Sequence, residues 1–280
     1  MWRLPLAAIV GVALFAPAPG GSMATPTTLA FARGGDIHTI AADGTGARRL
    51  IRSGYSPSWS RDGQWIAFVS RRSGDEEIYV ARADGTGVRR LTTRPGPDLG
   101  PAWSSDGTRL AWSHRATIWT MNASGANQRE LFGKAQSWHE HYSPAWHGDR
   151  IVFSSSRISA FNAELFSVRA IDGGGLRRLT FTKGDDGVLG DDGMPDFSPD
   201  GKRIVFTSNR DRQGEIYVMN HDGSGQRRLT RKPGDDFTPR FSRDGRQIAF
   251  TALPGTVFVV AADGSGLRRL TSGTDPDWRR

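Results

Sequence analysis

The feature that most constrains this 280-residue chain is an internal repeat. The motif Asp-Gly-x-Gly-x-Arg-Arg-Leu returns along the whole chain, with one degenerate copy at 122–131. The leucines that close the six copies are 41, 40, 48, 50 and 41 residues apart: Leu50, Leu91, Leu131, Leu179, Leu229 and Leu270. A unit of about 40 residues cannot bury an apolar face alone, so the repeats must pack against one another.

A second motif, Pro-x-(Trp/Phe)-Ser-x-Asp-Gly followed by an apolar run, alternates with the first. Together they predict four short strands per unit, with Asp-Gly turns where glycine accepts a positive φ. Four-stranded units of this length are typical of propeller blades, so we predict an all-β, six-bladed β-propeller. One aromatic position per unit is expected to pack between neighbouring blades: Trp59, Trp103, Trp146, Phe197, Phe241 and Trp278.

The two ends of the repeat region each hold part of one unit. The last copy of the second motif starts at Pro276-Asp277-Trp278 and breaks off, while its missing continuation, Leu29-Ala30-Phe31, stands near the start of the chain. An open stack would need capping units instead of a divided one. We therefore predict that the C-terminal innermost strand pairs with the N-terminal second strand and closes the ring.

Residues 1–24 are predicted to be a signal peptide, and residues 25–280 the propeller. Arg3 provides a positive start, 4–16 is apolar, and small residues stand at Ser22 and Ala24 before the expected cleavage point. The apolar run is shorter than the roughly 20 residues of a membrane span. The chain has no cysteine and no second such run. We expect a periplasmic or secreted protein without an integral membrane segment after cleavage.

The formal net charge of +8 is carried by the repeat rather than by one basic patch. Ten arginines stand in the five Arg-Arg pairs of the repeated motif, at 48–49, 89–90, 177–178, 227–228 and 268–269, and without them the charge would be −2. Charge on the outermost strand of a blade discourages pairing with other chains. We therefore expect no nucleic-acid partner and a monomeric protein.

The repeat resembles a known family at Ser-Pro-Asp-Gly-Lys-Arg-Ile-Val-Phe-Thr-Ser-Asn-Arg-Asp (198–211) and Glu-Ile-Tyr-Val-Met-Asn-His-Asp-Gly-Ser-Gly-Gln-Arg-Arg-Leu-Thr (215–230). Both segments are similar to the propeller repeat of the TolB family. That resemblance implies a periplasmic propeller that binds a peptidoglycan-associated lipoprotein, here without the N-terminal α/β domain. Propellers of prolyl-oligopeptidase-type peptidases and oligogalacturonate lyases carry the same repeat, so the fold does not select one function.

The residues that break the repeat are the candidates for function. Blades four and five are preceded by longer connections, 136–142 and 184–193, and polar residues stand three positions before the proline in four blades. Both features are expected at one mouth of the central channel. We predict that partner-binding residues there are Asp98, Trp138, His139, Glu140, His141, Asp191, Asp192 and Asp236.

Three interpretations of this mouth remain open. It is a solvated surface, a docking face for a protein or envelope polymer, or a divalent-cation site built from His139, His141, Asp192 and Asp236. The cation site would permit a metal-assisted polysaccharide lyase or hydrolase. No Gly-x-Ser-x-Gly elbow or phosphate-binding loop is present. We favour a non-enzymatic binding module with no catalytic residues and no required cofactor.

The export prediction can be tested by mass. The protein recovered from the periplasm or medium should begin at or within a few residues of Thr25, because signal peptidase reads the small residues before it. Intact-mass spectrometry of the recovered chain measures this directly. Finding only full-length chain, and only in the cytoplasm, would contradict the prediction.

Overall fold

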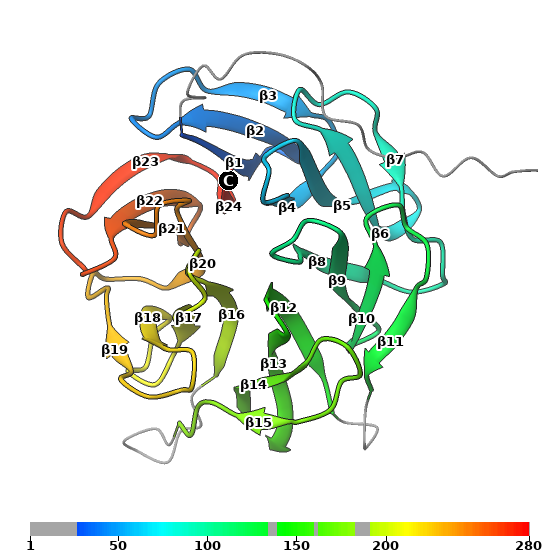
Figure 1. Ribbon diagram of the computed structural model, residues 1–280. Helices are drawn as coiled ribbons and strands as arrows, with labels where there is room; N and C mark the ends of the chain where they lie inside the picture. Colours follow the sequence, from blue (N-terminus) through cyan, green and yellow to red (C-terminus); the bar gives the residue numbers. More distant parts are fainter. Residues whose placement is uncertain (1–26, 134–138, 160–161, 183–190, 280) are drawn as a thin grey trace, which may run out of the picture.

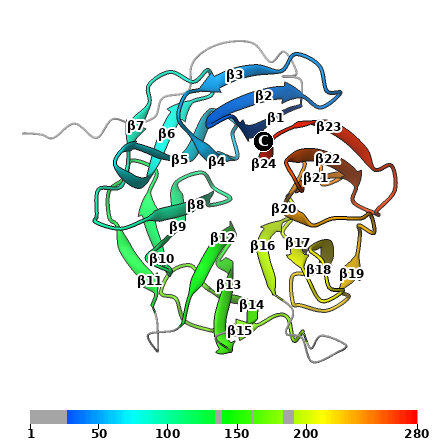
Figure 2. The same cartoon turned by 180° about the vertical axis from the view of Figure 1, so that it is seen from behind.

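The computed structural model describes residues 27–133, 139–159, 162–182 and 191–279. The elements in these ranges are all strands, and they form six four-stranded antiparallel sheets. Figure 1 shows the sheets arranged around a central axis, and Figure 2 shows the same ring from behind. No helix long and apolar enough to cross a membrane occurs in the described ranges. The prediction of a six-bladed β-propeller is confirmed.

The first three blades are formed by the first half of the chain together with its C-terminal strand. From the centre outward, blade one is β24 (Thr274–Trp278), β1 (Thr28–Arg33), β2 (Asp36–Ala41) and β3 (Arg48–Ile51). Blade two is β4 (Tyr55–Trp59), β5 (Trp65–Ser73), β6 (Asp75–Arg82) and β7 (Arg89–Arg90). Blade three is β8 (Asp98–Trp103), β9 (Arg109–His114), β10 (Thr117–Asn122) and β11 (Arg129–Phe132).

The other three blades follow in chain order. Blade four is β12 (His141–His147), β13 (Arg150–Ser159), β14 (Asn162–Arg169) and β15 (Arg177–Arg178). Blade five is β16 (Asp192–Phe197), β17 (Arg203–Ser208), β18 (Glu215–Asn220) and β19 (Arg227–Arg228). Blade six is β20 (Asp236–Phe241), β21 (Gln247–Ala252), β22 (Thr256–Ala261) and β23 (Arg268–Ser272).

The ring closes in blade one as the sequence predicts. β24 pairs antiparallel with β1, with Leu29 opposite Trp278 and Ala30 opposite Asp277. The backbone N–H of Arg279 extends the pairing by donating to the carbonyl of Thr28 at 2.7 Å. The C-terminus lies beside β1 in Figure 1. Each innermost strand contacts the innermost strand of the next blade around the whole ring.

Every innermost strand carries a bulge at the residue before its proline. The pairing register shifts there in all six blades, and the residue has a positive φ between 46° and 59° in each: Ser56, Gly100, Ser143, Met194, Thr238 and Asp275. This conformation costs a non-glycine residue about 1 kcal/mol or more, and a bulge bends and twists its strand. The bulge divides each innermost strand into a segment at one mouth and a segment inside the channel.

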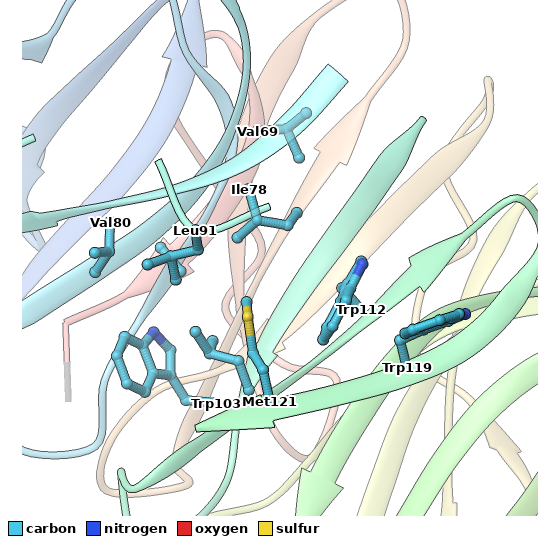
Figure 3. Packing of buried hydrophobic residues seen from close by; sticks show 10 residues of the cluster. Val69, Ile78, Val80, Leu91, Trp103, Trp112, Trp119 and Met121 are labelled. Carbon is cyan, nitrogen blue, oxygen red and sulfur yellow. The ribbon is translucent and has the colours of Figure 1, made fainter. Parts of the chain in front are cut away.

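The apolar core consists of layers between adjacent blades. In the layer between blades two and three, Trp103 of β8 packs with Val80 and Leu91 of blade two and with Met121 of β10 (Figure 3). The predicted ring aromatics are all at most 8% exposed, which confirms their place between blades. Burial of one such side chain contributes up to about 3 kcal/mol to the free energy of unfolding. Each layer is built from side chains of two neighbouring blades.

The arginine pairs join blades as well as charging their edges. The first arginine of a pair reaches the next blade: Arg89 donates to the carbonyls of Ala123 and Ser124 at 2.9 and 2.8 Å, and Arg227 to those of Ala262 and Asp263. Arg268 closes the same series by donating to the carbonyl of Ala42 at 2.6 Å. In three pairs the second arginine turns back into its own blade and meets a buried glutamate: Arg90 with Glu77, Arg178 with Glu164, and Arg228 with Glu215.

Loss of the closing strand should destabilise the whole ring. Deleting residues 275–280 exposes the edge of β1 and the layer in which Trp278 packs on Leu29 and Phe31. Loss of one buried tryptophan alone typically costs about 3–5 kcal/mol, so we expect the melting temperature to fall by about 10 °C or more. Deleting residue 280 alone is the control. Equal melting curves for the two deletions would contradict the closure.

Candidate functional site

The two ends of the central channel differ in width. At the end where the innermost strands begin, a hollow of about 770 Å³ lies over blades three to six, and a second of about 760 Å³ lies beside blades one to three. Leu99 lines both hollows. At the opposite end a cavity of about 30 Å³ lies among the innermost strands. We call the open end the wide mouth.

The narrow end is bridged by a side chain. Arg61, in the first turn of blade two, donates from both terminal nitrogens to the carbonyl of Pro199 in blade five, at 3.3 and 3.4 Å. Blades two and five stand opposite each other in the ring. Arg61 therefore crosses the narrow end of the channel. A ligand of more than a few atoms reaches the interior of the channel from the wide mouth.

The polar residues that precede the prolines do not form an exposed ring at that mouth. Asp98, His141, Asp192 and Asp236 have exposed fractions of 1, 0, 0 and 0%. Their side chains are buried between blades instead of facing one another across the channel, so these four residues are not exposed at the mouth where the sequence analysis placed them. The bulge accounts for the difference, because the extra residue changes which face of the strand a side chain occupies.

The three aspartates follow a pairing rule between neighbouring blades. Each interacts electrostatically with a glutamate in the first three residues of the third strand of the preceding blade: Glu77 with Asp98, Glu164 with Asp192, and Glu215 with Asp236. The corresponding positions in the other three junctions are Asp36 with Gly54, Thr117 with His141, and Thr256 with Gly273. The aspartates thus occur only where a glutamate faces them.

Cations inside the same junction balance each pair. Between blades four and five, Glu164 pairs with Arg178 at 2.8 Å, and Asp192 with Arg210 at 3.1 Å. Between blades five and six, the partners are Arg228 for Glu215 and Lys232 for Asp236, the latter at 2.6 Å. Between blades two and three, Arg90 serves Glu77, while Asp98 contacts His114 Nδ1 at 2.7 Å and Trp112 Nε1 at 2.8 Å.

Burial sets the electrostatics of these junctions. Desolvation raises the pKa of Glu77 and Glu164, and the like charge of the facing aspartate acts in the same direction. Desolvation also outweighs the Lys232 ammonium and raises the pKa of Asp236 to about 6. The two junctions with glycine have no room for a carboxylate, since a Cβ on Gly54 would approach the Phe68 ring to 2.9 Å and one on Gly273 the Phe31 ring to 2.5 Å.

The remaining predicted residues separate into two groups. Glu140 and Asp191 are exposed and line the hollow over blades three to six, and Asp191 also accepts from the N–H of Ala163 at 2.7 Å. His139 and His141 are buried, 6.4 Å apart between ring centroids. Trp138 and most of the 184–193 connection lie outside the described residues.

The proposed cation ligands are not brought into one group. Asp192 and Asp236 each face a cation of their own junction, and His141 packs against the Phe132 and Phe153 rings at 5.1 and 5.5 Å. Over the parts of the chain that the structure describes, no three His, Asp or Glu side chains lie close enough to hold a metal ion.

Sequence reasoning missed several residues that line the wide mouth. Ser113, Tyr142, Thr207, Arg212 and Phe237 all border the larger hollow. The register of the strands places four of them. Tyr142 and Phe237 stand two residues before the proline of an innermost strand, and Ser113 and Thr207 pair with that position from the second strand of their blades. Simple alternation counted from the proline would not have found them, because the bulge before the proline shifts the faces of the strand by one residue.

The fold and its mouth place the chain among propellers built from TolB-type repeats. The family model described as TolB beta propeller domain matches residues 37–189 and 187–278, and the chain belongs to this family.

Two curated relatives and one solved structure show the extent of the similarity. The chain is 34% identical over 227 residues to the Tol-Pal system protein TolB of Anaeromyxobacter dehalogenans, covering 77% of this chain and 47% of that protein. It is 32% identical over 170 residues to a protein TolB homolog of Chlorobium luteolum, covering 59% and 36%. TolB from Acinetobacter baumannii shares the fold with a TM-score of 0.77 at 19% identity, over 90% of this chain and 66% of that one.

The buried carboxyl of Asp236 should leave a signature in the pH dependence of stability. Its folded pKa of about 6 lies above the ordinary aspartate pKa of 3.8 expected in the unfolded chain, so the folded state binds the proton more tightly. Its contribution to the free energy of unfolding therefore falls by about 3 kcal/mol as pH rises from below 4 to above 6. Asp236→Asn removes this titration. Between pH 4 and pH 7, the free energy of unfolding of the variant, measured by urea unfolding, should therefore rise by about 3 kcal/mol relative to wild type.

An exposed aspartate supplies the control. Asp149→Asn, in the first turn of blade four, should give a curve parallel to wild type over the same range. Parallel curves for Asp236→Asn and wild type would show that Asp236 is ionised at the same pH in the folded and unfolded states.

Proposed function

We propose that this protein is an exported, monomeric, non-enzymatic binding module of the cell envelope, and that a protein partner docks on its wide mouth. The observation that carries the proposal is the asymmetry of the channel, which is bridged by Arg61 at one end and open in two hollows at the other. A concave surface that breaks the symmetry of a repeat is the default position for a binding site.

Family membership supports an envelope role. The relative in Anaeromyxobacter dehalogenans is named as a Tol-Pal system protein, and this chain corresponds to 47% of its length. The predicted signal peptide at 1–24 agrees with a periplasmic or secreted location. We extend the protein-binding role to this chain because its resemblance covers the propeller throughout residues 37–278.

Charge on the rim would orient a partner. Exposed Glu140 and Asp191 and half-exposed Asp235 stand on the hollow over blades three to six. The hollow beside blades one to three carries Arg72 and the ion pair of Arg71 with Glu76, which leaves an excess of one positive charge there. A mouth with opposite charge on its two sides favours one orientation of a complementary surface and repels the reverse one. In this proposal Glu140 and Asp191 contact the partner, while Asp98, Asp192 and Asp236 hold the blades beneath it.

The alternative of a lyase or hydrolase at the channel mouth receives less support. Such an enzyme needs carboxylates or imidazoles that can reach a substrate. Asp192, Asp236 and His141 have no exposed surface, and the two aspartates are already paired with cations. The binding module needs only the exposed rim.

Reversing charge on both sides of the rim should abolish capture of the partner. We expect Glu140→Lys combined with Arg71→Glu to reduce recovery of the partner from envelope extract at least tenfold, because two rim contacts become repulsive. Quantitative mass spectrometry of the captured proteins measures the change, and circular dichroism checks the fold.

The matched control reverses charge on the opposite face. Lys202→Glu with Arg246→Glu alters two exposed side chains in turns at the narrow end. It should capture the same proteins as wild type. If both variants and wild type capture identical sets in equal amounts, the wide mouth is not the docking surface.

A further inference from the structure

The floor of the hollow over blades three to six carries a series of hydroxyl groups. Ser113, Ser154, Thr207 and Thr251 occupy one position on the second strands of these blades, opposite Leu99, Tyr142, Gly193 and Phe237. The same position holds Ala32 and Val69 in blades one and two. Ser113, Ser154 and Thr207 all line the hollow. This position therefore carries a hydroxyl in the four blades that border the hollow, and an apolar side chain in the two blades that do not.

Two of these hydroxyls are buried without a partner in the described part of the chain. Ser113 is 1% and Thr207 8% exposed, and neither side-chain oxygen has a hydrogen-bond partner among the described residues. The same holds for Oδ1 of Asn162, which lines the hollow too. Thr251 differs, since it bonds Thr238 Oγ1 at 2.8 Å and accepts from the N–H of Asp275 at 3.0 Å.

Unmatched buried polar atoms are costly for folding, and native proteins pair nearly all of them. Two hydroxyls and an amide oxygen that border one hollow, on three consecutive blades, are suited to a ligand that both donates and accepts hydrogen bonds. Thr251 shows that this fold can pair a hydroxyl at the same position internally.

The sides of the hollow add aromatic surface and acidic groups. Tyr142 is 37% exposed, and half-buried Phe237 lines the same hollow from blade six. Burial, together with a hydrogen bond to Glu140, raises the pKa of Tyr142 to about 12, so its phenol stays protonated. Apolar ring faces next to hydroxyl, amide and carboxylate groups match a molecule with C–H faces and many hydroxyls, which is the chemistry of a sugar ring.

Charge narrows the class of sugar. The carboxylates of Glu140, Asp191 and Asp235 line the hollow against the single guanidinium of Arg212 within its described lining. Negative charge on the walls repels the carboxylates of a polyuronate, whereas an uncharged or amino-bearing sugar can bind without this repulsion.

We propose that the hollow over blades three to six binds a short oligosaccharide of uncharged or amino sugars, held by Ser113, Thr207 and Asn162. This site goes beyond the protein docking proposed for the rim and does not depend on it. It assigns a ligand to the floor of the hollow, whereas the docking surface is defined by charges above the floor.

The test uses Ser113→Ala combined with Thr207→Val, which removes both hydroxyls at nearly constant shape. The probes are β-1,4-linked tetrasaccharides of N-acetylglucosamine, glucosamine and glucose, titrated by calorimetry. We expect wild type to bind at least one of them and the double variant to bind it at least tenfold more weakly. The melting temperature should stay equal or rise, because an apolar group replaces an unpaired buried hydroxyl.

Thr251→Val is the matched control. Its hydroxyl is paired within the protein, so this variant should lose thermal stability and keep the affinity for the sugar. A double variant that melts far below wild type would show that Ser113 and Thr207 are structural, and would overturn the proposal.

Two further results would overturn it. One is that wild type binds none of the three tetrasaccharides at millimolar concentration. The other is that tetragalacturonate or an uncharged hexapeptide binds wild type more tightly than every one of them and loses affinity in the double variant. The single rim variant Arg71→Glu separates the two proposals, since Arg71 lines the other hollow: loss of protein capture in this variant should leave the affinity for the sugar unchanged.

Discussion

The structure depends on packing between neighbouring blades, and that packing is complete only when the ring is closed. Each apolar layer combines side chains from two blades, as Trp103 does with Leu91 and Met121. In the last layer, Trp278 joins Leu29 and Phe31 although they stand at opposite ends of the chain. Since no layer belongs to one blade alone, a break anywhere exposes two apolar faces, and the stability of the ring is a property of the whole molecule.

Buried polar residues between neighbouring blades also determine which blades fit together. Three junctions contain facing carboxylates with their cations, and the other three contain glycine or histidine at the corresponding place. Removing one partner of such a group leaves a buried charge without compensation. Gly54 and Gly273 exclude a carboxylate by contact with phenylalanine rings. Blades with almost the same sequence are therefore not interchangeable, because each fits the chemistry of its own neighbour.

The repeat predicted the fold, the number of blades and the closing strand, because these follow from spacing and alternation along the chain. The candidate site was predicted only in part. Asp192 and Asp236 were recognised as exceptions, yet the one-residue bulge after them, marked by positive φ at Met194 and Thr238, is not visible in the motif and sets which face they occupy. Glu164 and Glu215 precede them by more than 20 residues, so only the assembled ring shows the pairing. Trp138 lies outside the described residues, and its role stays a prediction.

With the guanidinium of Arg61 hydrogen-bonded across the narrow end, the wide mouth is the broad opening of the channel. A ligand larger than the cavity of about 30 Å³ at the narrow end must enter and leave by the wide mouth. Two ligands that both require the interior then compete for one entrance, and neither can be passed through the ring to the other side. Binding to such a propeller is competitive: the affinities and concentrations of the ligands decide which of them occupies the interior. One ligand replaces another only after the first has dissociated.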